Sequence, residues 1–273
     1  MDMKTDITLN SGRRMPLMGL GTYQLKDSTA ETVEAALKMG YRMIDTSGDY
    51  GTQRGIGMGL HSSGLKRNDY YLQTKVEEDD DAYEAVMKNL DELKLDQVDL
   101  VLIHRPPPSG AGVDLWHGLI QAKLDRLTRD IGVSNYSPEQ IQELIDDTGQ
   151  VPVVNQIEWT PFGHSQQMLD YCSEHSIIVQ AYSPLTRGKR LSEPTLRTIA
   201  KRHGKTPAQV LLRWNLQLGA VPLPKANQAE HLKENIDIFD FSLSAQEMED
   251  LRELNEYYSS WSFLPYVQQL TAR

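Results

Sequence analysis

Residues 41–51 read YRMIDTSGDYG, and this stretch contains the pattern that decides the fold. Its first part, Tyr41 to Ile44, is a short apolar run of the kind that forms a buried strand. Asp45 stands where the run stops, and Tyr50 follows five residues later in a turn that contains glycine. The stretch therefore predicts a strand whose carboxyl end carries a carboxylate and a phenol.

The same alternation of strand-like and helix-like segments continues along the chain. Strands are expected at residues 17–21, 41–44, 70–74, 98–103, 130–133, 153–157, 177–181 and 220–223. Helices are expected at residues 28–39, 53–60, 81–93, 115–127, 138–147, 165–174, 192–202, 207–217 and 244–254. Apolar strands that alternate with helices predict an α/β protein with a parallel sheet, and eight repeats predict a (β/α)8 TIM barrel. Two extended pieces around Asn10-Ser11-Gly12 predict an N-terminal β-hairpin.

The chain contains no linker-like tract of Pro, Gly and Ser, so residues 1–273 are expected to form a single barrel domain. The competing doubly wound fold needs a G-x-G-x-x-G phosphate loop directly after a strand. The candidate for that loop, GIGMG at 55–59, has the spacing G-x-G-x-G and follows a loop. We therefore interpret these glycines as positions of close helix packing.

The composition excludes several kinds of partner. A formal net charge of -10 and a pI of about 5.2 argue against nucleic acid and anionic membranes. No apolar run approaches the roughly 20 residues that span a bilayer, and no signal peptide is apparent. The single cysteine, Cys172, suits a reducing compartment, so we expect a cytoplasmic protein, monomeric or weakly homo-oligomeric, with Cys172 on a buried helix face. No metal-binding motif occurs, and the acidic run EEDDD at 77–81 is interpreted as a helix start.

Polar side chains follow the expected strands at the end where a barrel places its active site. Besides Asp45 and Tyr50, Lys75 ends the third strand and His104 ends the fourth. An ammonium ion at Lys75 is expected to lower the pKa of Tyr50, and Asp45 is expected to hold that ammonium in place. Tyr50 would then protonate a carbonyl oxygen, which His104 would also bond, and a nicotinamide would have to supply the hydride.

Taken singly, these side chains also have plainer interpretations. Asp45 suits a turn, Lys75 suits a surface position at a strand end, and His104 suits a loop. Their coincidence at predicted carboxyl ends favours the catalytic interpretation.

Longer motifs resemble those of the aldo-keto reductases, of the bacterial type with a short C-terminal tail. They span residues 15 to about 243 and read MPLMGLGTYQL, GYRMIDTSGDYG, YYLQTKV, DLVLIHRP, RDIGVSNYS, VVNQIEW, QAYSPL, GKTPAQVLLRW and LPKANQAEHLKENIDIFDFSLS. The resemblance implies a barrel that reduces small aldehydes and ketones with NADPH, NADH being a weaker donor. It implies a catalytic tetrad of Asp45, Tyr50, Lys75 and His104, with Tyr50 as the general acid.

The resemblance also implies which residues bind the cofactor. Ser134, Asn135 and Gln156 match positions that bond the nicotinamide carboxamide, and Tyr182 matches the aromatic residue that stacks on its ring. The remaining matches are Thr22, then Ser183, Leu185 and Arg187 at the pyrophosphate, Lys225, Ala226, Asn227 and His231 at the 2′-phosphate, and Glu234 and Asn235 at the adenine.

Three departures from the family pattern bear on specificity. His231 stands where many members have an arginine, which weakens the expected preference for NADPH. Arg105 stands where a tryptophan often follows the catalytic histidine. A short tail and a short 185–191 loop imply an open substrate pocket, and its candidate wall residues are Tyr23, Arg105, Trp116 and Trp159.

Two other functions are alternatives at this point. A Schiff-base lyase would use Lys75 as its amine, but it leaves Tyr182 and the segment at Lys225 unexplained. A non-catalytic regulatory barrel would bind a nucleotide without turnover, and the intact tetrad argues against it.

Overall fold

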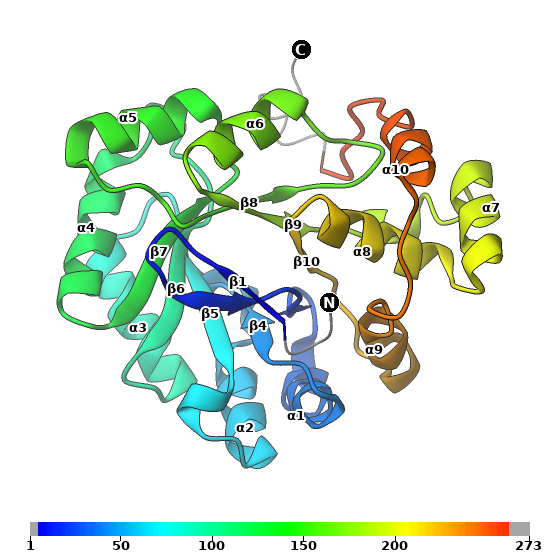
Figure 1. The fold of residues 1–273 in the computed structure, drawn as a ribbon. Coiled ribbons are helices and arrows are strands. Elements are labelled where there is room, and N and C mark those ends of the chain that lie inside the picture. Colours follow the sequence, from blue (N-terminus) through cyan, green and yellow to red (C-terminus); the bar gives the residue numbers. More distant parts are fainter. Residues whose placement is uncertain (1–4, 262–273) are drawn as a thin grey trace.

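The computed structural model describes residues 5–261, which contain a sheet of eight parallel strands ringed by helices (Figure 1). The strands are β3 (Leu20–Gly21), β4 (Met43–Asp45), β5 (Tyr71–Val76), β6 (Val98–Ile103), β7 (Thr128–Ser134), β8 (Val154–Glu158), β9 (Ile178–Tyr182) and β10 (Val221–Leu223). Each strand pairs with the next in chain order. The first and last strands meet where Gly19 N donates to Pro222 O (3.2 Å) and Gly21 N donates to Pro224 O (3.1 Å). The predicted (β/α)8 barrel is confirmed.

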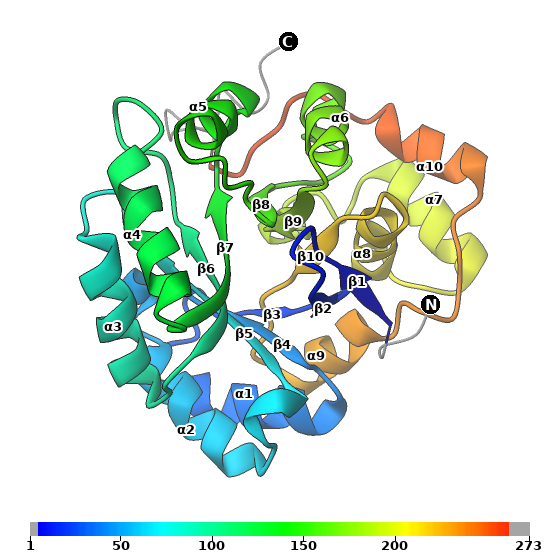
Figure 2. The same ribbon diagram turned by 60° about the vertical axis from the view of Figure 1, so that its left-hand side comes forward.

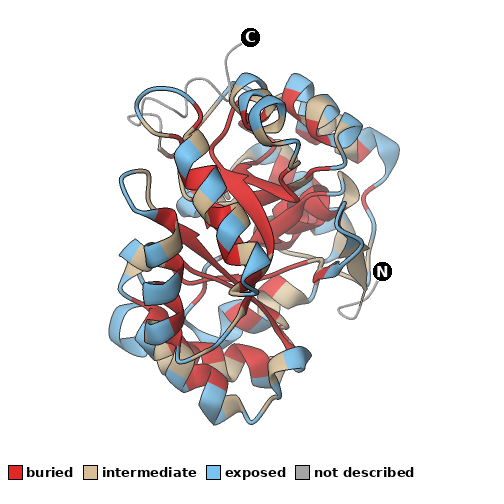
Figure 3. Ribbon diagram, turned by 90° about the vertical axis from the view of Figure 1, so that its left-hand side faces the viewer, coloured by how far each residue is buried: buried red, intermediate tan, exposed pale blue. Residues whose placement is uncertain are grey.

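The helices lie outside the strands, as two views of the ribbon show (Figure 2). They are α1 (Thr29–Met39), α2 (Gln53–Ser63), α3 (Ala82–Leu93), α4 (Val113–Leu124), α5 (Pro138–Thr148), α6 (Gln166–Glu174), α7 (Pro194–His203), α8 (Pro207–Gln217), α9 (Ala229–Ile236) and α10 (Ala245–Arg252). Figure 3 shows that their inner faces and the strands are buried while their outer faces are exposed. Within residues 5–261, no helix is long and apolar enough to cross a membrane.

Local sequence explains where several helices begin and end. Thr206 and Ser244 each accept a hydrogen bond from the third amide of their helix, and both form capping boxes. Helix α4 ends earlier than predicted because Arg126 has a left-handed backbone (φ 63°). Helix α2 runs three residues further than predicted, until Gly64 (φ 71°) terminates it. Helix α9 was not among the helices predicted from the sequence.

The N-terminal hairpin closes the barrel at the amino ends of its strands. Its strands are β1 (Asp6–Thr8) and β2 (Arg14–Pro16), and they pair antiparallel as predicted. Met15 is fully buried and belongs to an apolar cluster with residues such as Met43, Tyr71 and Val221, which begin strands or precede them closely. The opposite end, where the carboxyl ends of the strands converge, is therefore the end left for a site.

The glycines of GIGMG serve packing, as predicted. A Cβ on Gly55 would lie 2.9 Å from the Thr29 side chain, and one on Gly59 would lie 2.6 Å from Ala30 O. A Cβ on Gly57 would lie 2.6 Å from Leu93 O. Helix α2 therefore approaches both α1 and α3 at distances that exclude any side chain.

Candidate active site

The carboxyl ends of the strands surround a cavity of about 650 Å³. Most of the predicted site residues line it, namely Tyr23, Asp45, Tyr50, His104, Arg105, Ser134, Asn135, Gln156, Tyr182, Ser183, Leu185, Arg187, Lys225, Ala226, Asn227 and His231. The others, which lie off the cavity wall, are Thr22, Lys75, Trp116, Trp159, Glu234 and Asn235. We call the part formed by Asp45, Tyr50 and His104 the tyrosine side, and the part formed by Arg187, Lys225 and His231 the basic side.

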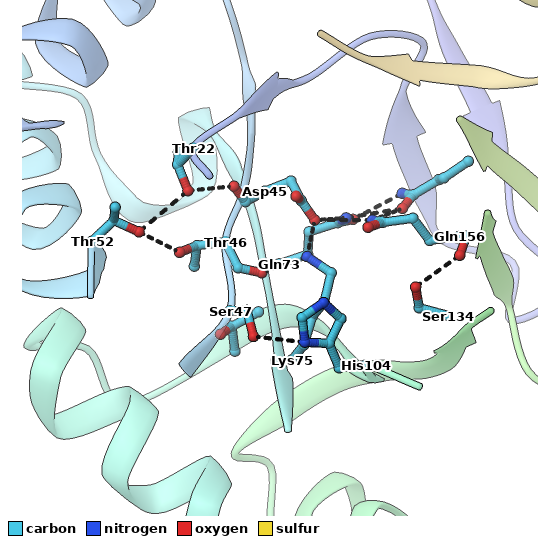
Figure 4. Close-up of polar contacts among 12 residues, drawn as sticks. Thr22, Asp45, Thr46, Ser47, Thr52, Gln73, Lys75, His104, Ser134 and Gln156 are labelled. Carbon is cyan, nitrogen blue, oxygen red and sulfur yellow. Dashed lines mark hydrogen bonds and ion pairs between the residues drawn. The ribbon is translucent and has the colours of Figure 1, made fainter. Parts of the chain in front are cut away.

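A buried ion pair forms the floor beneath the tyrosine side (Figure 4). Lys75 Nζ lies 2.8 Å from Asp45 Oδ1 and donates to Thr46 O at 2.7 Å. The Lys75 side chain is fully buried, and that of Asp45 is 6% exposed. Charges this deep are stable only when they are paired and hydrogen-bonded, which is the case here. The predicted Asp45–Lys75 pair is therefore present in the structure.

Three strand glutamines complete the floor, and the sequence analysis had singled out only one of them, Gln156. Asp45 Oδ1 accepts from Gln73 Nε2 at 2.6 Å and from Gln156 Nε2 at 2.9 Å. Gln180 Oε1 accepts from the same two amides, and Gln180 Nε2 donates back to Gln73 Oε1 at 2.8 Å. A signal existed in the sequence, since Gln73 stands two residues before Lys75 and therefore points to the same face of its strand.

Tyr50 lies half-buried on the cavity wall above this floor. Its ring centroid is 5.0 Å from Lys75 Nζ, and its ring meets that of His104 edge-on at 5.7 Å. The pKa of Tyr50 is raised, so the prediction that Lys75 lowers it is wrong. Burial raises that pKa well above its usual value, and the carboxylates of Asp45, Asp49 and Glu77 raise it further. Tyr50 is therefore held in its protonated form.

Glu77, which follows β5, pairs with two consecutive residues of the loop after β6. His104 Nδ1 lies 2.8 Å from Glu77 Oε2, and Arg105 Nη2 donates to the same oxygen at 2.9 Å. Ser47 Oγ donates to Glu77 Oε1 at 2.7 Å. Burial alone would raise the pKa of Glu77, but the bonds and charge of His104, followed by those of Ser47 and Arg105, lower it to about 2.

This role of Glu77 was not predicted from the sequence. Within EEDDD, Asp81 does cap α3, because its side chain accepts from Glu84 N. Glu77 and Glu78 instead pair with the loop at His104 and Arg105, and Glu78 Oε2 lies 2.9 Å from Arg105 Nε. The interpretation of the whole run as a helix start was therefore wrong for its first two residues.

Asp49, Glu77 and His104 are the one group in residues 5–261 whose ligand atoms, all within 4.8 Å of one another, are close enough to hold a metal ion. The space between the two carboxylates already contains a cation, because Arg105 Nη2 lies 2.9 Å from Glu77 and 3.5 Å from Asp49. We therefore interpret the cluster as an ion-pair network.

The aromatic wall of the cavity differs from the one predicted. Tyr23 lines it, with its ring 5.0 Å from that of Tyr50 and 5.9 Å from that of Trp261. Trp116 and Trp159 were wrongly assigned to it, because both are buried in the apolar core outside the cavity. Trp261, which lies in the C-terminal tail, also lines the cavity and was not predicted as part of its wall.

The basic side is formed by the loop after β10 and by α9, which carries His231. Lys225, Asn227 and His231 are exposed, and Ala226 is buried between them. Within residues 5–261, neither Lys225 nor His231 has an acidic partner. Farther along α9, Glu234 accepts a hydrogen bond from Thr206, and Asn235 is 3% exposed. Neither of these two reaches the cavity wall.

The loops after β7 and β9 connect the two sides. Asn135 Nδ2 donates to His104 O at 3.0 Å, and Tyr182 Oη donates to Asn135 Oδ1 at 2.8 Å. Ser134 Oγ donates to Gln156 O. Ser183 and Arg187 both have left-handed backbones (φ 47° and 53°), so this segment turns sharply along the wall.

Thr22 lies beneath the wall, fully buried, where its hydroxyl donates to Asp45 O at 2.8 Å. It is also 3.4 Å from Thr52 Oγ1 (Figure 4). Thr22 thus supports the backbone at Asp45 from below.

Known proteins resemble this chain along most of its length. The model of the aldo/keto reductase family matches residues 17–256. An aldo-keto reductase of Mycobacterium tuberculosis is 43% identical over 256 residues, which cover 92% of this chain and 91% of that protein. A solved aldo/keto reductase of Brucella melitensis is 38% identical with a TM-score of 0.88, covering 93% of this chain and 99% of that one. An aldo-keto reductase of Bombyx mori, solved in complex with NADP, is 30% identical with a TM-score of 0.89, covering 96% and 98%.

Proposed function

This chain belongs to the aldo/keto reductase family and is an NAD(P)H-dependent oxidoreductase that acts on small carbonyl compounds; we propose that it reduces aldehydes and ketones to alcohols, with NADPH as hydride donor and Tyr50 as general acid. The observation that carries the proposal is the position of Tyr50. Its ring lies on the cavity wall and contacts both the Lys75 ammonium and the His104 imidazole. A carbonyl oxygen beside these groups would meet both a proton donor and a second polar partner.

Tyr50 is suited to give up its proton only late in the reaction. Its raised pKa keeps the phenol protonated at neutral pH, so the donor is present when the substrate arrives. As negative charge develops on the substrate oxygen, that oxygen becomes a stronger base and takes the proton. The ammonium of Lys75, 5.0 Å from the ring centroid, then stabilises the phenolate, and Asp45 keeps that ammonium in position.

The residues of the cavity fit a phosphorylated dinucleotide. The exposed side chains of Arg187, Lys225 and His231 offer donors for phosphate groups, while Asn135 and Gln156 offer side-chain amides in the same cavity as Tyr50. When bound, the nicotinamide supplies the hydride that no side chain can supply. The solved relative from Bombyx mori was obtained with NADP, which supports the phosphorylated form here. We infer that Lys225 contributes most to the preference for NADPH.

The Schiff-base alternative lacks support because Lys75 is inaccessible. Its amine is fully buried, bonded to Asp45 and Thr46, and absent from the cavity wall. A carbonyl substrate would have to displace the floor of the barrel in order to reach it.

A panel of aldehydes, ketones and keto esters, assayed with NADPH and NADH separately, tests the proposal. We expect turnover of several aldehydes and greater catalytic efficiency with NADPH. Tight NADPH binding without turnover of any carbonyl compound would contradict the proposal and favour the regulatory alternative.

A further inference from the structure

His104 has its two ring nitrogens in different surroundings, and the difference depends on Glu77. Nδ1 faces Glu77 and Ser47, whereas Nε2 has no hydrogen-bond partner among the described residues. His104 lines the cavity, but Glu77 does not. We propose that Glu77 is a positioning residue that fixes one proton on His104 Nδ1, so that Nε2 donates to a carbonyl oxygen only when the ring carries a second proton.

The proton on Nδ1 follows from the neighbours of that atom. Glu77 Oε1 and Oε2 lie 2.9 and 2.8 Å away, and a carboxylate can only accept. Ser47 Oγ, 3.5 Å away, uses its single proton in the bond to Glu77. Asp49 Oδ1, at 3.8 Å, is a further acceptor. Every group that faces Nδ1 therefore requires a proton there.

Glu77 remains an acceptor at any pH at which an enzyme works. The bonds from His104, Ser47 and Arg105 outweigh burial, and they hold the pKa of this carboxyl at about 2. The tautomer with its single proton on Nε2 would leave this carboxylate facing the lone pair of Nδ1. That arrangement is repulsive, so the neutral ring takes the Nδ1–H form.

The consequence concerns the direction of the reaction. A neutral ring presents a lone pair at Nε2, which can accept a proton from an alcohol but cannot bond a carbonyl oxygen. A doubly protonated ring presents an N–H at the same place and bonds the oxygen as it gains charge. The inference rests on the proposed carbonyl reduction and adds that His104 takes part in it as an imidazolium ion.

The other charges around His104 must be counted with Glu77. Asp49, from the turn before Tyr50, favours the charged ring, and Arg105, the next residue in the chain, disfavours it. Glu78 and Asp49 offset much of the Arg105 charge. The Tyr50 ring meets His104 edge-on, and the Lys75 ammonium beneath that ring is paired with Asp45. Glu77 therefore has the strongest direct effect on the His104 proton.

The pH dependence of kcat/KM for aldehyde reduction tests the inference in the intact enzyme. We expect reduction to fall on the alkaline side in the wild type, where the ring loses its second proton. In Glu77→Gln the neighbouring negative charge is gone, so this fall should move to lower pH. Glu77→Asp, which keeps the charge, should move it less. An alkaline fall at the same pH in Glu77→Gln and in the wild type would overturn the inference.

The matched control is Glu247→Gln. Glu247 Oε2 lies 3.0 Å from His203 Nε2, between α10 and α7 and away from the cavity. Glutamine also preserves the capping box with Ser244, so this variant removes a Glu–His pair without touching the site. Its pH profile should match that of the wild type.

Nitrogen-15 spectra of the histidines give a readout that needs no turnover and so stands apart from the proposed function. In the wild type at alkaline pH, His104 should carry its proton on Nδ1 with Nε2 bare. A neutral ring protonated on Nε2 would overturn the inference even if Glu77→Gln loses all activity, and an Nδ1–H signal supports it even if no carbonyl substrate is found.

Discussion

On the tyrosine side of the cavity, basic side chains are paired with carboxylates. Lys75 pairs with Asp45, and Glu77 pairs with both His104 and Arg105. On the basic side, Lys225 and His231 are exposed and have no acidic partner within residues 5–261. The fold therefore holds in place the groups that would act on the reacting atoms. The basic groups that would only bind a ligand stay exposed and available to it. Substitutions on the tyrosine side should consequently change both catalysis and stability, whereas those on the basic side should change affinity alone.

The largest effect is expected for Tyr50→Phe, which removes only the proposed proton donor. Reductase kcat should fall on the order of a hundredfold to ten-thousandfold, the usual range for loss of a general acid. NADPH binding, followed by fluorescence titration, should be unchanged and serves as the internal control. Near-full turnover by the variant would show that another group protonates the substrate.

Lys75→Met tests whether the tyrosine side also supports the fold. It leaves the Asp45 carboxylate buried without its ion partner, which typically costs about 3–5 kcal/mol of unfolding free energy. The control is Lys94→Met, because Lys94 pairs with Asp91 on the surface, where both side chains are more than three-quarters exposed. Loss of an exposed pair of this kind should change the unfolding free energy far less. If Lys75→Met and Lys94→Met lost equal unfolding free energy in urea, the buried pair would stabilise the fold no more than an exposed pair does.

Glu77 should make stability depend on pH in the acid range. Its pKa is lowered from 4.5 to about 2 in the folded protein, so the ionised form stabilises the fold above about pH 4.5 and this gain is lost as pH falls towards 2. The wild type should exceed Glu77→Gln in unfolding free energy at pH 7, and the gap should narrow by about 2 kcal/mol at pH 3. A gap independent of pH would mean that Glu77 contributes through packing instead of charge.

The smallest effect on stability belongs to the basic side. Lys225→Ala removes one charge-assisted bond to the proposed 2′-phosphate, a bond that contributes roughly 1.5 to 3 kcal/mol. The ratio of catalytic efficiencies for NADPH and NADH should therefore fall by about 10- to 150-fold. Unfolding free energy should stay within about 0.5 kcal/mol of the wild type, since the side chain is exposed and has no ion-pair partner among residues 5–261. A ratio that Lys225→Ala leaves unchanged would place the phosphate elsewhere.

The sequence was sufficient to predict the barrel because its signals are local. Apolar runs and capping residues such as Thr206 and Ser244 determine where strands and helices start, and each of these features is written within a few residues. The polar residues at strand ends were predictable for the same reason, since Asp45 and His104 stand directly where an apolar run stops.

The features that could not be predicted depend on contacts between segments that are far apart in the sequence. Glu77 meets His104 across two neighbouring strands, and no spacing within the sequence indicates that pairing. The fully buried positions of Trp116 and Trp159 depend on which face of each element turns inward, and residue type does not reveal that. The pKa of Tyr50 is set first by burial, which only the folded arrangement determines.

The glycines of α2 also matter to anyone who would diversify this enzyme. A side chain at Gly57 would meet the backbone oxygen of Leu93, and backbone cannot move aside as a flexible side chain can. Random libraries should therefore return almost no functional clones altered at residues 55, 57 or 59, although none of these residues lines the cavity. Mutations are better directed to the loops at Tyr23 and Trp261, where substitutions can change the shape of the cavity without disturbing the packing of a helix.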